Sequence, residues 1–192
     1  MSASSPPLRL WASILAVAGV QTAILGWMVW DRVTLLDRGR EVVIDVVPVD
    51  PRSLFRGDYV RFNYDFSRIP TEIVAERPER GRPVWVLIEK GEGDKWKAVK
   101  ASGKPLAGAD DRHVLLKGHV EGWFSGHLKS TFPIPIRYGI ESFFVPEGEG
   151  LDLEKLVREK RISVLLAVRD DGTSAIKGIM ADGKPIMREN RL

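Results

Sequence analysis

Residues 161–187, RISVLLAVRDDGTSAIKGIMADGKPIM, decide the fold class of this 192-residue chain. Ile162, Val164, Leu166 and Val168 alternate with other residues, so a strand would place all four on one face. The sequence then turns at RDDGT, returns along SAIKGIM, turns again at ADGK and ends with PIM as an edge strand. Short apolar runs separated by such turns are typical of an antiparallel meander.

The same pattern extends toward the N-terminus. In residues 41–49, EVVIDVVPV, the side chains of Val42, Ile44 and Val46 share one face. Further strands are predicted at 83–89, 94–100 and 112–120, the first two forming a hairpin. Residues 150–160 predict one short helix with Leu153, Leu156 and Val157 at helical spacing. The fold class we predict is mainly β: a small antiparallel sandwich or barrel-like domain with one short helix, preceded by an N-terminal transmembrane helix.

Residues 10–30 contain 21 residues without a charge, enough for a helix to cross the roughly 30 Å hydrocarbon core of a bilayer. Indoles near both ends fit the membrane interfaces. The rival interpretation is a cleaved secretory signal, but no site of small residues follows the run. We therefore expect a tail at 1–9, a transmembrane helix at 10–30, a juxtamembrane segment at 31–40 that continues the helix to Gly39, and a β-rich domain at 41–192.

The orientation of this anchor stays open. Arg9 precedes the span, whereas Arg32, Arg38 and Arg40 follow it, and the positive-inside rule then favours a cytoplasmic C-terminal domain. A nine-residue tail before a single apolar span instead resembles an export signal retained as a signal-anchor. That second interpretation predicts a C-terminal domain outside the cytoplasm.

Composition excludes several classes of site. The 29 Lys and Arg and 26 Asp and Glu are mixed along the chain, without the basic block that a nucleic acid needs. There is no cysteine, which excludes disulfides and thiolate catalysis. His113 and His119 would stand about 20 Å apart on one strand, and His127 has no acidic neighbour, so no metal site is predicted. No cofactor is expected.

The stretch LFRGDYVRFNY, residues 54–64, predicts a turn that leads into a strand. Gly57 allows positive φ and Asp58 can accept a backbone hydrogen bond. A strand from Tyr59 to Phe66 would place Val60, Phe62, Tyr64 and Phe66 in the core and Tyr59, Arg61, Asn63 and Asp65 on the other face. The two tyrosines are thereby separated, and only Arg56, Asp58 and Tyr59 remain candidates for a role beyond folding.

Gly57 to Tyr64 resembles the signature of the GDYXXLXY family, with Phe62 in place of Leu. The resemblance extends to ESFFVPEGEG (141–150) and IKGIMADGKPI (176–186). It implies a bacterial protein anchored by one helix in the inner membrane, of a family without an assigned biochemical activity that is often encoded beside multi-pass membrane proteins. The candidate functional or structural residues it indicates are Arg56, Gly57, Asp58, Tyr59, Phe62, Tyr64, Glu141, Pro146, Glu147 and Gly148.

The resemblance favours an interaction or structural module that binds the lipid bilayer through its helix and acts with a multi-pass membrane protein. Two alternatives stay open: a hydrolase-like or ligand-binding enzyme on a small β scaffold, and an envelope sensor. Arg56 to Val60 also looks like a box of membrane-bound signal peptidases, but Ser53 lacks the expected context and no lysine precedes Lys90.

No catalytic residue is therefore assigned. A further hypothesis places Glu141 or Glu147 over Asp58, with Arg56 as the counter-charge of one acidic site. Phe143, Phe144 and Val145 are predicted to lie in the core or in an interface.

Overall fold

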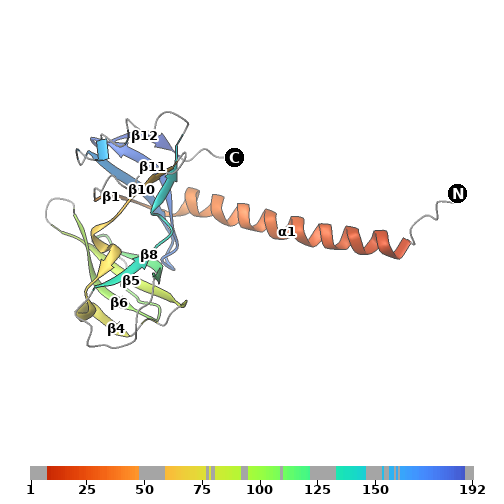
Figure 1. Ribbon diagram of the computed structural model, residues 1–192, viewed down its shortest axis with the longest axis horizontal. Coiled ribbons are helices and arrows are strands. Elements are labelled where there is room, and N and C mark those ends of the chain that lie inside the picture. The colour runs from red at the N-terminus through yellow and green to blue at the C-terminus, as the bar shows by residue number, and fades with distance from the viewer. Residues whose placement is uncertain are drawn as a thin grey trace.

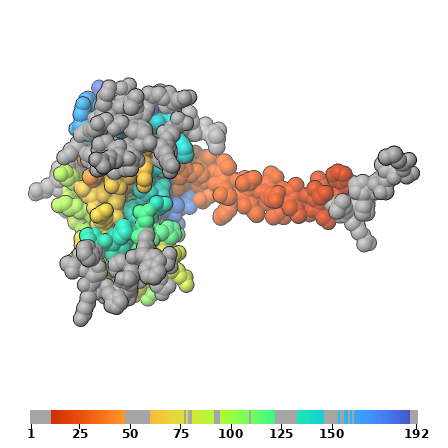
Figure 2. Space-filling view, viewed as in Figure 1, coloured from red at the N-terminus to blue at the C-terminus, as the bar shows by residue number. Residues whose placement is uncertain are grey.

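The computed structural model describes residues 8–47, 59–76, 78, 81–91, 95–108, 110–121, 133–145, 153, 156, 157, 159 and 161–188. The chain is mainly β, with one long apolar N-terminal helix, as the sequence predicts. Figure 2 shows that helix projecting as a single rod from the body formed by the strands.

Helix α1 (Leu8–Arg38) is long and apolar enough to cross a membrane and is a candidate anchor. The predicted continuation to Gly39 is confirmed, because the Gly39 amide donates to the Leu35 carbonyl at 2.9 Å and the first strand begins at the next residue. A Cβ at Gly39 would lie 2.5 Å from the Leu35 oxygen, so this junction requires glycine.

The sheet next to the helix has four antiparallel strands in the order β1-β10-β11-β12 (Figure 1). They are β1 (Arg40–Asp45), β10 (Ile162–Val168), β11 (Ser174–Ala181) and β12 (Lys184–Arg188). This confirms the predicted meander of the last three strands and the edge position of β12. We call these four strands the anchor-side sheet.

The central strand β10 is buried on both faces rather than on the single predicted face. Ile162, Val164, Leu166 and Val168 lie in the core as predicted. The opposite face is covered as well, because Ala167 lies beneath the helix end, its Cβ 3.1 Å from where a Cβ on Gly39 would be. The anchor thus shields a strand that would otherwise face water.

A second sheet has six strands in the order β3-β8-β7-β5-β6-β4. They are β3 (Arg68–Ile69), β8 (Ile134–Arg137), β7 (His113–Val120), β5 (Pro83–Lys90), β6 (Trp96–Ser102) and β4 (Val74–Glu76). The hairpin of β5 and β6 is confirmed. One pair departs from the antiparallel prediction, since β4 runs parallel to β6.

The predicted strand from Tyr59 to Phe66 is wrong in length. Strand β2 covers only Tyr59–Arg61 and pairs with β9 (Ser142–Phe144). The chain then changes partner, because Asn63 bridges to Val47, and closes into a 3₁₀ turn, η2 (Asp65–Ser67). A second 3₁₀ turn, η3 (Thr71–Ile73), follows β3.

The predicted faces are nevertheless correct for residues 60–66, whereas the side chain of Tyr59 lies outside what the structure describes. Val60, Phe62, Tyr64 and Phe66 are all buried, whereas Arg61, Asn63 and Asp65 are exposed. The alternation survives the break in pairing because residues 62–64 stay extended between the strand and the turn.

One hydrophobic core joins the sheets. Trp96 of β6 donates its indole N–H to the Val43 carbonyl of β1 at 2.8 Å, a direct link between the two larger sheets. Of the predicted helix at 150–160, Leu153, Leu156 and Val157 are described, are helical and pack in or against this core. The remaining predicted helical residues lie outside the described part of the chain, except Glu159, which lies in a turn.

Candidate functional site

Six of the ten candidate residues lie outside the described residues: Arg56, Gly57, Asp58, Pro146, Glu147 and Gly148. The hypothesis of an acidic site around Asp58 therefore stays a prediction. The other four, Tyr59, Phe62, Tyr64 and Glu141, are described and lie in one region of the domain.

The two stretches that carry the family resemblance are adjacent in space. Strands β2 and β9 pair so that Tyr59 lies opposite Phe144 and Val60 opposite Phe143. One residue further, the Phe62 amide donates to the Glu141 carbonyl at 2.8 Å. Segments about 80 residues apart in the sequence thus form one structural unit. Phe143 is buried as predicted, but Phe144 is 79% exposed and does not belong to the core.

Tyr64 holds this unit to the turn that precedes β9. Its buried hydroxyl donates to the Ile140 carbonyl at 2.5 Å, and its ring stacks on Phe66 with centroids 5.2 Å apart. Phe66 meets Tyr138 edge-on at 5.4 Å, and the Tyr138 hydroxyl donates back to the Phe66 carbonyl at 2.8 Å. Three aromatic rings therefore tie two segments together by packing and by hydrogen bonds.

The electrostatic surroundings keep both tyrosines neutral. Burial, and secondarily the charge of Glu141, raise the pKa of Tyr64 and of Tyr138 well above the ordinary value of 10.0. A phenol with such a pKa donates hydrogen bonds at neutral pH and does not act as a base or nucleophile. The last tyrosine of the signature is thus a structural donor.

Glu141 fixes the turn itself. Its carboxylate accepts hydrogen bonds from the backbone amides of Tyr138 and Gly139, the latter at 2.9 Å. Gly139 has a φ of +83°, a conformation that glycine adopts without strain. The carboxylate therefore satisfies backbone donors at a tight turn and positions the residue that Tyr64 binds.

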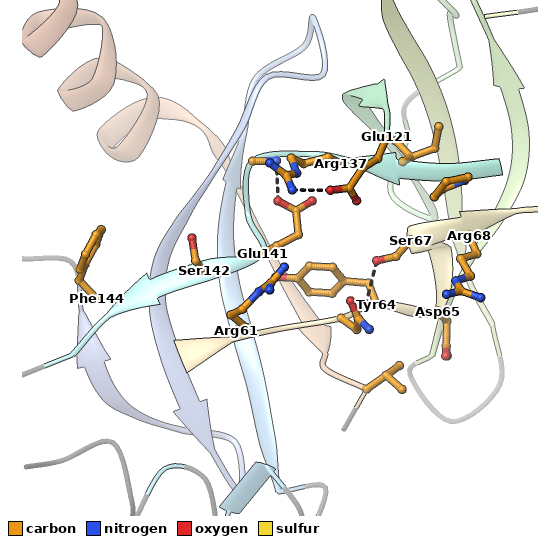
Figure 3. Close-up of a pocket in the computed structure, with 15 residues that line it drawn as sticks. Arg61, Tyr64, Asp65, Ser67, Arg68, Glu121, Arg137, Glu141, Ser142 and Phe144 are labelled. Atoms are coloured by element: carbon orange, nitrogen blue, oxygen red, sulfur yellow. Dashed lines mark hydrogen bonds and ion pairs between the residues drawn. The ribbon is translucent and has the colours of Figure 1, made fainter. Parts of the chain in front are cut away.

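Beside this unit lies an open groove of about 750 Å³ (Figure 3). Strands β2, β3, β8 and β9 and the 3₁₀ turn η2 all contribute to its walls. The lining residues are Val47, Arg61, Asn63, Tyr64, Asp65, Ser67, Arg68, Glu121, Pro135, Ile136, Arg137, Gly139, Glu141, Ser142 and Phe144. The volume is in the range of pockets that bind small ligands or short segments.

The charges in the groove differ in their partners. Arg137 forms an ion pair with Glu121 across the ends of β8 and β7. The side chains of Arg61 and Arg68, by contrast, form no hydrogen bond or ion pair with any described residue. The groove thus contains three guanidinium groups from three strands, and two of them have no partner in the part of the chain that the structure describes.

Sequence reasoning missed this groove. It assigned Arg61 and Asp65 to the outer face correctly, but it gave no role to Arg68, Glu121 or Arg137. The two-residue strand β3 and the four-residue strand β8 carry too short a pattern to be detected. The only usable signal was the outward position of Arg61 beside the motif.

The histidines lie elsewhere. His113 and His119 are both on β7, as predicted, and His127 lies outside the described residues. The His113 ring nitrogen lies 2.8 Å from an Asp110 carboxylate oxygen, and hydrogen bonds from His113 and from the Arg112 amide lower the pKa of Asp110. Among the described residues, no group of three or more His, Asp or Glu side chains is arranged to hold a metal ion.

A protein-family model described as GDYXXLXY protein matches residues 21–179, a range that includes both the end of α1 and the groove. Neither a curated protein nor a solved structure matches the chain.

Proposed function

The chain belongs to the GDYXXLXY family, and on that premise we propose that it is a single-pass membrane-anchored recognition module that presents its groove to a multi-pass membrane protein. The proposed location is the bacterial inner membrane, with the β-rich domain outside the cytoplasm. The observation that carries the proposal is the direct docking of the anchor helix on the domain.

This docking has three parts. Leu35, near the end of α1, is only 3% exposed and is buried against the domain. Arg169, in the turn between β10 and β11, donates to the Asp31 carboxylate at 3.0 Å and to the Asp31 carbonyl at 3.2 Å. No linker intervenes, since β1 begins two residues after the helix ends. A domain mounted in this way keeps a fixed distance and direction relative to its helix.

A fixed mount suits recognition of a partner in the same membrane. A flexible tether would let the groove sample many orientations, whereas docking removes that entropy before binding. The association with multi-pass proteins that the family resemblance implies supplies the partner class. The lining of the groove supports binding, because it presents guanidinium groups, carboxylates and a serine hydroxyl that can form hydrogen bonds with a partner.

The absence of cysteine allows a direct test. A single cysteine replaces Ser142 in the groove, and a matched variant carries it at the exposed Lys97 on β6, away from the groove. Each variant is treated with a short thiol-to-amine crosslinker in intact membranes. We expect the Ser142→Cys protein to crosslink to one integral membrane protein, identified by mass spectrometry, and the Lys97→Cys protein not to.

The same variants test the location. An impermeant maleimide should label Ser142→Cys in cells with a permeabilised outer membrane before lysis. Labelling only after lysis would place the domain in the cytoplasm and overturn the proposed location. Equal crosslinking from both positions, or crosslinking only to soluble proteins, would overturn the proposed recognition through the groove.

A further inference from the structure

Two arginines of the groove, whose side chains have no partner among the described residues, indicate the chemistry of its ligand. A guanidinium group carries five N–H donors in a planar fork that matches a carboxylate or phosphate. Arg61 comes from β2 and Arg68 from β3, and both line the groove. Their neighbour Arg137 is neutralised by Glu121, and Glu141 is occupied by two backbone amides. Among the described residues, the groove charges left without a partner are therefore those of Arg61, Arg68 and Asp65, a balance of one positive charge.

The acidic residues of the groove limit how much negative charge a ligand can carry. Asp65, Glu121 and Glu141 line the same space as the three arginines, so the formal charges of the lining cancel. A polyphosphate or a surface of anionic lipid would bring several negative charges close to these carboxylates. A ligand with one carboxylate among neutral groups avoids that repulsion and still satisfies the guanidinium groups.

The remaining walls suit an extended chain. On β9, Ser142 and Phe144 are both exposed and, being two residues apart, share the face that contributes to the groove (Figure 3). Ser142 lies opposite Arg61 in the pairing with β2. Val47, Pro135 and Ile136 add apolar surface. Polar and apolar contacts thus follow one another along the groove, as in sites that bind an extended peptide.

We propose that the groove binds an extended peptide segment bearing a single carboxylate side chain, which Arg61 and Arg68 hold through charge-assisted hydrogen bonds. This rests on the proposed function and names the part of the partner that the module recognises: an acidic, otherwise neutral, exposed segment.

The test measures binding to the full-length protein in nanodiscs of zwitterionic lipid. The probe is a fluorescein-labelled, amidated pentapeptide of Val, Thr, Glu, Val and Thr, and its match has Gln in place of Glu. By fluorescence anisotropy we expect the Glu peptide to bind at least tenfold more tightly. Arg61→Gln and Arg68→Gln should each weaken that binding about tenfold, in line with the loss of a charged hydrogen bond.

Lys97→Gln is the matched control, because it removes one exposed positive charge from β6 and leaves the groove intact. Neither arginine variant should alter the melting temperature, since both side chains are exposed and have no ion-pair or hydrogen-bond partner among the residues that the structure describes. Equal binding of the two peptides, no binding of either, or the same loss in Lys97→Gln would overturn the inference. Competition by glycerol phosphate as strong as that of the Glu peptide would assign the arginines to a lipid headgroup and overturn it as well.

The two proposals can fail separately. If the Ser142→Cys crosslink to a membrane protein persists when both arginines are replaced by Gln, the recognition module stands and its ligand chemistry is wrong. If the Glu peptide binds but no membrane protein crosslinks, the ligand chemistry stands and the membrane partner is wrong.

Discussion

The anchor-side sheet and the groove region are built differently. The four strands of the sheet are five to eight residues long, and six of the seven residues in β10 are buried. The groove is lined from strands of two to four residues, a 3₁₀ turn and exposed charged side chains. Long, regular strands support the docked helix, whereas the exposed charged side chains of the groove come from short strands and a turn. A binding surface placed on a supported frame combines precision with freedom to vary.

One turn connects the two regions. Between β10 and β11, the Gly172 carbonyl accepts from the Lys117 amide of β7 at 2.8 Å, and the Asp171 carbonyl accepts from the Trp85 indole of β5 at 3.2 Å. Arg169 in the same turn binds Asp31 of the anchor. The helix, the anchor-side sheet and the sheet that carries β8 therefore meet at residues 169–173.

The largest loss in the free energy of unfolding is expected for a substitution in the core of the anchor-side sheet. Leu166→Ala removes a side chain that is 0% exposed and leaves a cavity between packed strands, which should lower the free energy of unfolding by about 2–5 kcal/mol. Urea unfolding followed by circular dichroism measures it. Leu165→Ala, on the same strand but only half-buried, should cost clearly less. Equal losses would contradict the difference in burial between these two side chains.

A smaller loss in the free energy of unfolding is expected for a substitution of Tyr64, which supports the groove. Tyr64→Phe deletes the hydroxyl that binds the Ile140 carbonyl and leaves that buried acceptor unpaired, at a cost of about 1–3 kcal/mol. The same measurement at high pH tests the direction in which the stability changes with pH. Because the folded-state pKa of Tyr64 is raised, its stabilising effect is present below pH 10.0 and is lost as the pH rises above it.

The alkaline loss should therefore be smaller in Tyr64→Phe than in the unmodified protein. Tyr138→Phe is the matched comparison, since it removes the second buried hydroxyl. A variant that unfolds with an unchanged dependence on alkaline pH would show that Tyr64 is not buried as described.

The smallest effect should appear in acid, at an ion pair on the surface of the anchor-side sheet. Glu41 of β1 has a lowered pKa because Lys177 of β11 donates a hydrogen bond to it and lies 2.8 Å away. A lowered pKa stabilises the fold above the ordinary value of 4.5, and this contribution is lost as the pH falls below it. Glu41→Gln should lower the melting temperature at pH 7 by about 2 °C or less and have no effect at pH 3. A loss that persists at pH 3 would point to packing instead.

The long strands were predictable because each carries enough residues for its alternation to be detected. Ile162 to Val168 and Pro83 to Lys90 show a pattern that the surrounding turns confirm. The short strands were not, because Arg68 and Ile69 alone have no pattern, and their pairing depends on β8, more than 60 residues later. The end of β2 was missed for a similar reason: Asn63 leaves β9 for Val47, a tertiary event without a local signal.

The candidate site, too, was only partly predictable from the sequence. The buried face of the motif was predicted from its period, so Phe62 and Tyr64 were placed correctly. Their outward neighbours form a groove only because β8 brings Arg137 beside a segment that begins more than 70 residues earlier. Local sequence fixes which way a side chain points, but only the fold determines what it faces.

Because α1 continues directly into β1, the length of the helix also determines the direction in which the groove faces. Each residue of an α-helix adds about 100° of rotation and 1.5 Å of rise. If the helix spans the bilayer, a single residue inserted between Leu25 and Trp30 would swing the groove about 100° around the membrane normal without touching the domain. Seven inserted residues, nearly two full turns, would return it to within about 20° but about 10 Å further along. The length of the anchor therefore also sets the rotation of the domain around the membrane normal, and with it the direction in the membrane plane toward which the groove faces.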